Sequence, residues 1–176
     1  RGVPRDDPRH PGPQALAEIR EQELRRAAAM LGVREVRVLD FGDLALDAAS
    51  HPALVETIEA QLRDIRPDVV VTFGPDGAYG HPDHIAVSQS TTTAVMAAAE
   101  HGRPGEPHSA SKLYYLAWSS STWAAYEAAV GVLLSRVDGV ERRATPWPDW
   151  AITTVIDTEP YWATVWEAVS CHASQI

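Results

Sequence analysis

Residues 69–84 read VVVTFGPDGAYGHPDH, and this stretch decides the fold class. Its first five residues form a short, continuous apolar run, which is typical of a parallel strand covered on both faces. Three glycines follow, at Gly74, Gly77 and Gly80, and they permit sharp turns and close approach of the backbone. Pro82 suits the first turn of a helix. The stretch therefore predicts a strand, a loop and a helix in direct succession.

Helical and strand patterns alternate on both sides of this stretch. The expected helices are residues 14–31, 52–65, 82–100, 122–134 and 160–172, and the expected strands are residues 36–41, 69–73, 113–118 and 152–156. Such alternation predicts an α/β fold, a Rossmann-like layered sandwich with a mainly parallel sheet. We expect residues 1–176 to form a single domain. Because the chain opens with a loop and a helix, we expect its first strand or strands to be absent.

Composition narrows the function classes. The net charge is −9 and no stripe of Lys and Arg follows any segment, which argues against nucleic acid as the main partner. No run of about 18 apolar residues exists, so we expect no membrane span. The single cysteine, Cys171, excludes an internal disulfide and fits a reducing compartment. We therefore expect a cytoplasmic protein.

Chemistry is concentrated at His81, Asp83 and His84. In open α/β sheets, ligands bind beyond the carboxyl ends of strands, which is where these residues fall. The two histidines are three positions apart and share a helix face, with His81 near the N-cap. Asp83 can hold an imidazole tautomer or complete a metal shell. A catalytic zinc needs at least three protein ligands, and this segment supplies one or two.

Two other interpretations of the same residues stay open. Histidines near a helix start can be N-terminal caps or solvated side chains. The glycine-rich loop could cradle a phosphate on the amides of the following helix. It lacks, however, the spacing of a P-loop and of a dinucleotide fingerprint.

The strings FGPDG at residues 73–77 and YGHPDH at residues 79–84 closely resemble the second signature of the PIG-L/LmbE-like zinc-dependent N-acetylglucosaminyl deacetylases. This family includes the deacetylase of the mycothiol precursor. Four more stretches resemble family segments: residues 19–33, 66–72, 157–161 and 171–175. The resemblance covers nearly the whole chain.

The chain departs from the family at its first signature. The family carries an N-terminal His-Pro-Asp-Asp that supplies two zinc ligands and the aspartate that acts as general base. No such string occurs here, and Arg1-Gly2 resembles the end of the family's second strand. We therefore expect this metal motif to precede Arg1 and to be missing from the chain, which by itself should bind zinc poorly.

The resemblance implies a role for each matching residue. It makes His84 the zinc ligand that this chain contributes. His81 would stabilise the oxyanion and donate a proton to the leaving amine, and Asp83 would orient His81. Tyr79 would reach the same oxyanion with its hydroxyl. Zinc-bound water would lose its proton to the missing aspartate.

Further residues carry weaker expectations. By similarity, Arg20 and Asp43 would bind the sugar, although Arg20 can equally be a solvated helix residue and Asp43 a turn cap. We interpret His172, Ser174 and Gln175 as structural hydrogen-bonding partners near the site.

Together these features predict a zinc-dependent hydrolase that removes the acetyl group from an N-acetylated sugar or glycoconjugate. An N-acetylglucosaminyl-inositol-like substrate would yield acetate and a free amine. The alternatives are a non-catalytic carbohydrate-binding relative of the same fold and a phosphate- or nucleotide-binding α/β domain. We expect the loops at residues 102–111 and 138–149 to set substrate choice. The oligomeric state stays open, a homo-oligomer included.

Overall fold

The computed structural model describes residues 11–39, 41–42, 45–46, 51–132, 135–137 and 139–175. The chain divides into two compact units. The smaller unit combines Arg1–Asp40 with Val155–Ile176, and the larger unit is Phe41–Thr154. The expectation of a single domain stays a prediction.

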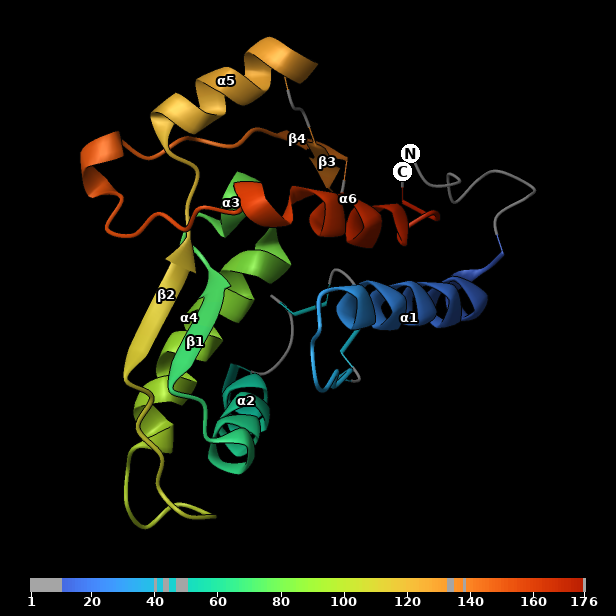
Figure 1. The fold of residues 1–176 in the computed structure, drawn as a ribbon. Coiled ribbons are helices and arrows are strands. Elements are labelled where there is room, and N and C mark those ends of the chain that lie inside the picture. Colours follow the sequence, from blue (N-terminus) through green and yellow to red (C-terminus); the bar gives the residue numbers. More distant parts are fainter. Residues whose placement is uncertain are drawn as a thin grey trace. The chain divides into compact units, whose positions relative to one another are not determined.

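The larger unit is built on two parallel strands, β1 (Val69–Phe73) and β2 (Lys112–Leu116). They pair in register from Val69 opposite Lys112 to Phe73 opposite Leu116. The helices α2 (His51–Ile65) and α4 (Pro82–Ala98) lie beside the strands (Figure 1). A parallel pair of strands joined through a helix is the arrangement that the sequence predicted around residues 69–84.

The core of this unit lies between the two helices and β1. Val55 and Leu62 of α2 are buried against Ala94 and Ala98 of α4, and Val70 of β1 packs onto this cluster. Small residues on α4 allow the two helices to approach closely, because alanine leaves room for the larger side chains of α2.

One face of β1 is covered and the other is open among the described residues. Thr72 is buried, whereas Val69 and Val71 are 47% and 59% exposed. The apolar run predicted a strand covered on both faces, and within the described part of the chain this is wrong. A continuous apolar run makes a strand suitable for burial on both faces. Burial of the second face also requires another element to pack against it, and the described residues contain none there.

The other helices and strands of the larger unit lie beyond the carboxyl ends of β1 and β2 (Figure 1). They are α3 (Gly77–Gly80), α5 (Ser120–Val130), β3 (Ser135–Val137), β4 (Val140–Arg142) and η1 (Asp149–Ala151). The strands β3 and β4 form an antiparallel hairpin, where the sequence predicted an irregular loop over residues 138–149. An Asp-Gly pair at residues 138–139 is a hairpin signal, and its left-handed Gly139 (φ 74°) suits the turn.

The smaller unit pairs α1 (Pro13–Met30) with α6 (Trp162–Ser170), which follows η2 (Glu159–Tyr161). Glu23 of α1 is 2% exposed, and its carboxylate accepts hydrogen bonds from the Ser174 amide (2.8 Å) and hydroxyl (2.7 Å). These bonds lower the pKa of Glu23 below its usual value. The expected hydrogen-bonding role of Ser174 is thereby confirmed, and its expected place near the site stays a prediction.

Two expected strands do not form. Residues 36–39 and 41, and residues 152–156, lie outside any strand in the described structure. Alternating apolar residues give a segment one apolar face that could pack in a sheet. A strand also needs a neighbouring strand to which its backbone hydrogen-bonds. The five expected helices all form, and α5 stops four residues early because Gly131 adopts φ 81°.

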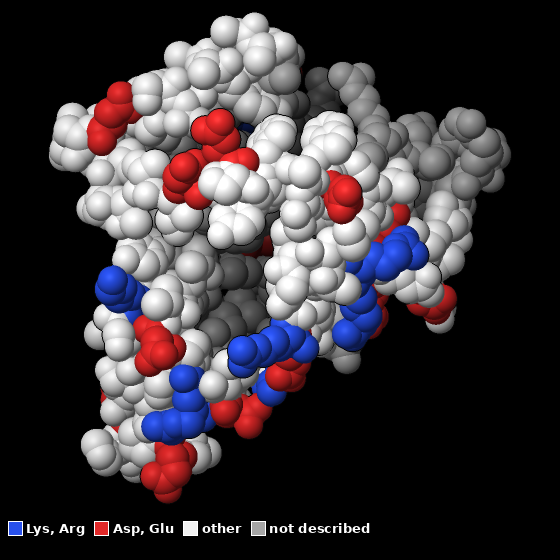
Figure 2. Space-filling model, in the orientation of Figure 1, with Lys and Arg blue, Asp and Glu red and all other residues white. Residues whose placement is uncertain are grey.

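On the face shown in Figure 2, the Lys and Arg side chains lie close to Asp and Glu side chains, and further acidic side chains lie apart from them. The ion pairs of the described residues include Arg25 with Glu21 and Arg143 with Glu127. Among the described helices, none combines the length and apolar character that a membrane crossing requires.

Candidate active site

The glycine loop (residues 74–80) leaves the carboxyl end of β1 in a tight path. A Cβ on Gly74 would lie 2.5 Å from Asp76 Oδ1 and 2.8 Å from the Leu116 carbonyl oxygen. Gly77 has φ 64°, and a Cβ there would lie 2.7 Å from a side-chain carbon of Ile85. The close backbone approach predicted for these glycines is confirmed, and it brings the loop against both β2 and α4.

The helix α4 begins as the sequence predicted. Pro82 occupies its first turn and His81 is the N-cap, with φ −68° and ψ 125°. The His81 side chain accepts a hydrogen bond from the Asp83 backbone amide, Nδ1 to N 3.2 Å. Side-chain capping of this kind satisfies an amide that the first turn of a helix leaves without a partner.

Four aromatic rings gather at the start of α4. His84 stacks on Phe73 (centroids 3.9 Å apart, 3° between planes) and on His81 (4.4 Å, 22°). Tyr79 meets His81 and His84 edge-on at 5.8 Å and 5.5 Å. The structure thus brings together three predicted site residues, His81, His84 and Tyr79. It adds Phe73, which the sequence marked only as the end of the strand and the first residue of the FGPDG string, with no role assigned to it.

The tautomer of neutral His84 follows from its hydrogen bond. Its Nδ1 lies 3.2 Å from the Gly77 carbonyl oxygen, which can only accept, so Nδ1 carries the proton. The lone pair of neutral His84 is therefore on Nε2. Burial of the ring lowers the pKa of His84, and His81 lowers it further. A neutral imidazole fixed through Nδ1–H to a carbonyl is the form in which histidine binds metals.

His81 has the opposite tautomer. Its Nδ1 accepts from the Asp83 amide, which can only donate, so the proton of neutral His81 is on Nε2. Neighbouring stacked imidazoles thus offer different chemistry at Nε2: His84 a lone pair, and His81 an N–H donor.

The family resemblance implied that Asp83 orients His81. In the structure, the backbone amide of Asp83 makes this contact by donating to His81 Nδ1. The Asp83 side chain is buried, and its Oδ1 accepts from the Leu46 amide at 3.1 Å. The predicted sugar-binding residue Asp43 lies outside the described residues. Arg20, the other residue expected to bind the sugar, is exposed on α1 in the smaller unit. Both assignments stay predictions.

Arg142, at the end of β4, reaches the glycine loop from the hairpin. Its Nη1 donates to the Gly80 carbonyl oxygen at 2.7 Å, across 62 positions of sequence. No local pattern marked Arg142, because its partner is a backbone atom distant in the chain. Through Arg142, the segment of residues 138–149 meets the glycine loop.

Residues 102–111 lie at the other end of the sheet, where β1 and β2 begin (Figure 1). Ser111 donates its amide to the Asp68 carbonyl, and the His108 ring bonds the Pro67 carbonyl at 2.8 Å. This position, opposite the glycine loop, contradicts the expectation that residues 102–111 set substrate choice. In a parallel pair, both strands begin at one end of the sheet and finish at the other. Residues 102–111 join α4 to the beginning of β2, so they lie at the end away from the glycine loop.

An ion-pair cluster anchors that loop to α2. The buried Arg63 donates to Glu59 Oε1 at 3.0 Å, and Arg103 of the loop donates to Glu59 Oε2 at 2.6 Å. Arg63 also bonds three backbone carbonyls, those of Ala97, Glu100 and Gly105. The cluster therefore stabilises the packing of the loop on α2 and α4, far from the site histidines.

His84 fits as one ligand of a zinc ion, because Nε2 has the lone pair and Nδ1–H is held by a carbonyl. Within the described ranges, however, no group of three or more His, Cys, Asp or Glu side chains is placed to hold a metal. A zinc site on this chain would need ligands beyond the described residues.

The start of α4 is a poor phosphate cradle. Pro82 has no N–H, and the Asp83 amide is occupied by His81 Nδ1. The Asp83 carboxylate nearby would repel an anion. This geometry disfavours the phosphate-binding alternative.

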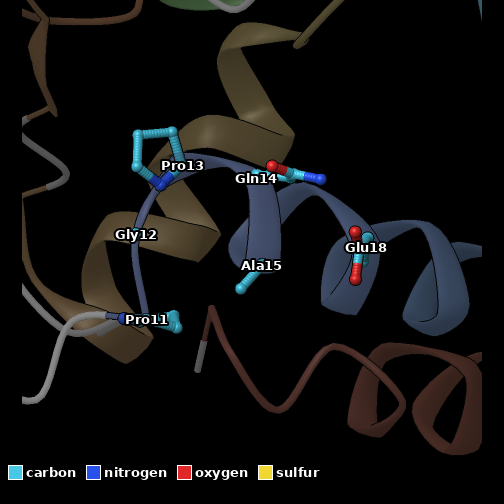
Figure 3. Close-up of a pocket in the computed structure, with 6 residues that line it drawn as sticks. All are labelled: Pro11, Gly12, Pro13, Gln14, Ala15 and Glu18. Atoms are coloured by element: carbon cyan, nitrogen blue, oxygen red, sulfur yellow. The ribbon is translucent and has the colours of Figure 1, made fainter.

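A hollow of about 310 Å³ lies at the start of α1, and its lining includes none of the site residues Tyr79, His81, Asp83 and His84. Its lining is Pro11, Gly12, Pro13, Gln14, Ala15 and Glu18 (Figure 3). Among the described residues of its lining, Glu18 alone is titratable, and one such group does not make an acid–base pair for catalysis.

Comparison with known proteins agrees with the site. A family model described as GlcNAc-PI de-N-acetylase (PIG-L) matches residues 1–95. A 1D-myo-inositol 2-acetamido-2-deoxy-alpha-D-glucopyranoside deacetylase from Thermobifida fusca is 36% identical, covering 92% of this chain and 63% of that protein. A protein of the same name from Rhodococcus jostii is 37% identical over 92% of this chain and 62% of its own length. The chain thus spans less than two thirds of these relatives.

A solved structure shares the fold. The conserved protein TT1542 from Thermus thermophilus aligns with a TM-score of 0.65 and 24% identity, covering 90% of this chain and 58% of that one. The family match over residues 1–95 contains the glycine loop, His81, Asp83 and His84, the residues that the structure gathers at the start of α4. The chain belongs to the GlcNAc-PI de-N-acetylase (PIG-L) family.

Proposed function

We propose that the whole protein is a zinc-dependent N-deacetylase acting on an N-acetylglucosaminyl-inositol-like substrate, releasing acetate and a free amine. The observation that carries the proposal is the pair of stacked imidazoles with opposite tautomers, His84 and His81. Family membership and the names of the relatives support the reaction and the substrate class.

In this proposal His84 is the zinc ligand that this chain contributes. Bound zinc would polarise the acetamide carbonyl and lower the pKa of its water towards about 7. The carbonyl of Gly77 keeps Nε2 of His84 unprotonated, and the stacked Phe73 ring restricts rotation of the imidazole.

His81 would act on the carbonyl oxygen of the substrate. Its Nε2–H would donate a hydrogen bond as that oxygen gains negative charge, and the Tyr79 hydroxyl would donate a second. Delivery of a proton to the leaving amine by His81 would require the imidazolium form, and that form cannot accept the Asp83 amide at Nδ1. The oxyanion role therefore fits the described geometry directly.

Two broader assignments accompany this function. We propose that β1 and β2 belong to a Rossmann-like, mainly parallel sheet, which is supported by their parallel pairing and by the shared fold with TT1542. We also propose a cytoplasmic location, for which the single cysteine is the supporting feature.

The test measures zinc content and acetate release from N-acetylglucosaminyl-inositol in the full-length natural protein and in three variants. His84→Ala should lose both zinc and activity. His81→Ala should keep zinc and lose kcat by about 10²–10³-fold, as expected for removal of an oxyanion donor. His101→Ala, at an exposed position in the loop opposite the site, should change neither.

Absence of metal and of acetate release with every N-acetyl sugar tried would reject the enzyme. Binding of those sugars without hydrolysis would then support a non-catalytic carbohydrate-binding relative.

A further inference from the structure

We propose that Arg142 is a positioning residue of this site: its guanidinium holds the Gly80 carbonyl and so fixes the backbone from which His81 projects. The effect on activity rests on the proposed deacetylase function. The contact between the hairpin and the glycine loop can be tested independently of that function.

Among the described residues, two hydrogen bonds hold the Gly80–His81 peptide, and the bond from Arg142 is the shorter one. Arg142 Nη1 lies 2.7 Å from the Gly80 oxygen, a short distance for a charge-assisted bond. On the other side of the same peptide, the His81 amide donates to the Gly77 carbonyl at 3.4 Å, near the limit for a hydrogen bond. The orientation of this peptide therefore depends mainly on Arg142.

The peptide needs such a restraint because Gly80 is left-handed, with φ 75°. Glycine reaches many backbone conformations at similar free energy, so the residue itself does not select this one. A rotation of the Gly80–His81 peptide would displace the His81 ring from its place 4.4 Å from the His84 ring. It would also alter the bond between His81 Nδ1 and the Asp83 amide, which sets the tautomer.

The Arg142 side chain makes this contact through one nitrogen. Its Nε is buried, and no hydrogen-bond partner for Nε is found in the described part of the chain. Nη1 is therefore the group whose removal tests the proposal, and a lysine, whose terminal ammonium also donates hydrogen bonds, should replace most of its effect.

Arg143 offers a matched control. It follows Arg142 directly, and it pairs with Glu127 of α5 at 2.9 Å while its side chain is 57% exposed. Removing Arg143 takes away one positive charge and one hairpin contact without touching the glycine loop. An exposed pair of this kind contributes little to stability.

The experiment compares Arg142→Met, Arg142→Lys and Arg143→Met in the full-length natural protein. Arg142→Met should lower kcat about 10–100-fold through displacement of His81, with KM changed by less than about threefold and zinc content unchanged. Arg142→Lys should recover most of the lost kcat, and Arg143→Met should stay within about twofold of the parent. Should Arg142→Met fail to fold, Arg142→Leu, which also lacks a donor, takes its place with the same expectation.

A structural readout accompanies the kinetics. In ¹H–¹⁵N spectra, the His81 amide and ring signals should shift in Arg142→Met and not in Arg143→Met. Unchanged His81 signals, an unchanged kcat, or equal losses in the Arg142 and Arg143 variants would each overturn the proposal. If the parent protein releases no acetate, the proposed function fails, and the His81 signals alone decide the role of Arg142.

Discussion

Gly74 occupies the point where β1, the glycine loop and the end of β2 come closest. The Asp76 carboxylate could swing away from an added Cβ, but the Leu116 carbonyl, 2.8 Å from that Cβ, belongs to a paired strand. Gly74→Ala should therefore lower the free energy of unfolding by about 1–3 kcal/mol, measured by urea denaturation. Gly42→Ala is the control, since its Cβ would meet Ala45 Cβ at an ordinary 3.5 Å. Equal effects of the two variants would contradict the clash.

Ala78 is strained, with φ 65° and ψ −50° in the middle of the glycine loop. Such a conformation costs a residue with a Cβ about 1–3 kcal/mol, and strain of this kind often occurs at functional sites. Ala78→Gly should relieve this strain, but it also gives the unfolded chain more conformational entropy, which opposes folding. The net result should be a free energy of unfolding that is higher by about 1 kcal/mol. The substitution should also lower kcat, because Tyr79 next to it becomes less restricted. Thermal unfolding and kinetics on one preparation test both effects, and a destabilised variant would contradict the strain.

At the residue scale, the sequence predicted those features of the site that depend on interactions between near neighbours in the chain. The spacing of His81, Pro82 and His84 was enough to predict an N-cap and a shared helix face, because both depend on neighbours within one turn. Phe73 and Arg142 could not be predicted in the same way. Their partners are a ring 11 positions away and a backbone carbonyl 62 positions away, respectively, and only the folded chain brings them together.

At the scale of elements, Glu59 links α2 to the loop at residues 102–111. Glu59→Gln would leave Arg63 and Arg103 with a neutral acceptor, and should lower the free energy of unfolding at pH 7 by about 1–3 kcal/mol. Glu56→Gln, an exposed change on the same helix, should have little effect. Urea denaturation of both variants provides the comparison.

The contribution of Glu59 should also depend on pH. Hydrogen bonds from Arg103 and, less strongly, from Arg63 hold the pKa of Glu59 below its ordinary value of 4.5, although burial opposes them. A carboxylate with a lowered pKa in the folded state stabilises fully above the unfolded value, and the stabilisation is lost as the pH falls through the folded value. The difference between the parent and Glu59→Gln should therefore be constant above about pH 5 and shrink below about pH 4.5. A constant difference down to about pH 3 would contradict this linkage.

Helices were easier to predict than strands for a physical reason. The periodicity, caps and prolines of α1, α2, α4, α5 and α6 are contained in each segment, and all five formed. A strand needs a partner elsewhere in the chain, and the segments at residues 36–41 and 152–156 have the right alternation but no ladder in the described structure. The β3–β4 hairpin, by contrast, had a usable turn signal in its Asp-Gly pair.

At the scale of the whole molecule, Glu23 and Ser174 join positions 151 residues apart. Glu23→Ala should release the Ser174 amide and raise its hydrogen-exchange rate by at least about tenfold, since a buried acceptor of two bonds is lost. Glu21→Ala is the matched control, because Glu21 forms an exposed pair with Arg25 one turn apart on α1. Exchange at Ser174 that is equal in both variants would show that other contacts hold this segment.

The family resemblance predicted more of the molecule than any single pattern did. It related segments from residue 19 to residue 175 to one fold, and family membership is confirmed. The expectation of one domain, and the sugar-binding roles of Arg20 and Asp43, depend on how distant segments meet. Neither motif spacing nor periodicity contains that information.

The separation of the two ends of the β1–β2 pair has a practical use. A fluorophore could be attached at residues 102–111 without approaching the His81 side of the sheet, for instance through Glu106→Cys at an exposed position. The native Cys171 is partly exposed and would first be replaced by serine. The labelled protein should keep the kinetics of the parent, because the dye occupies a position that the chemistry does not use.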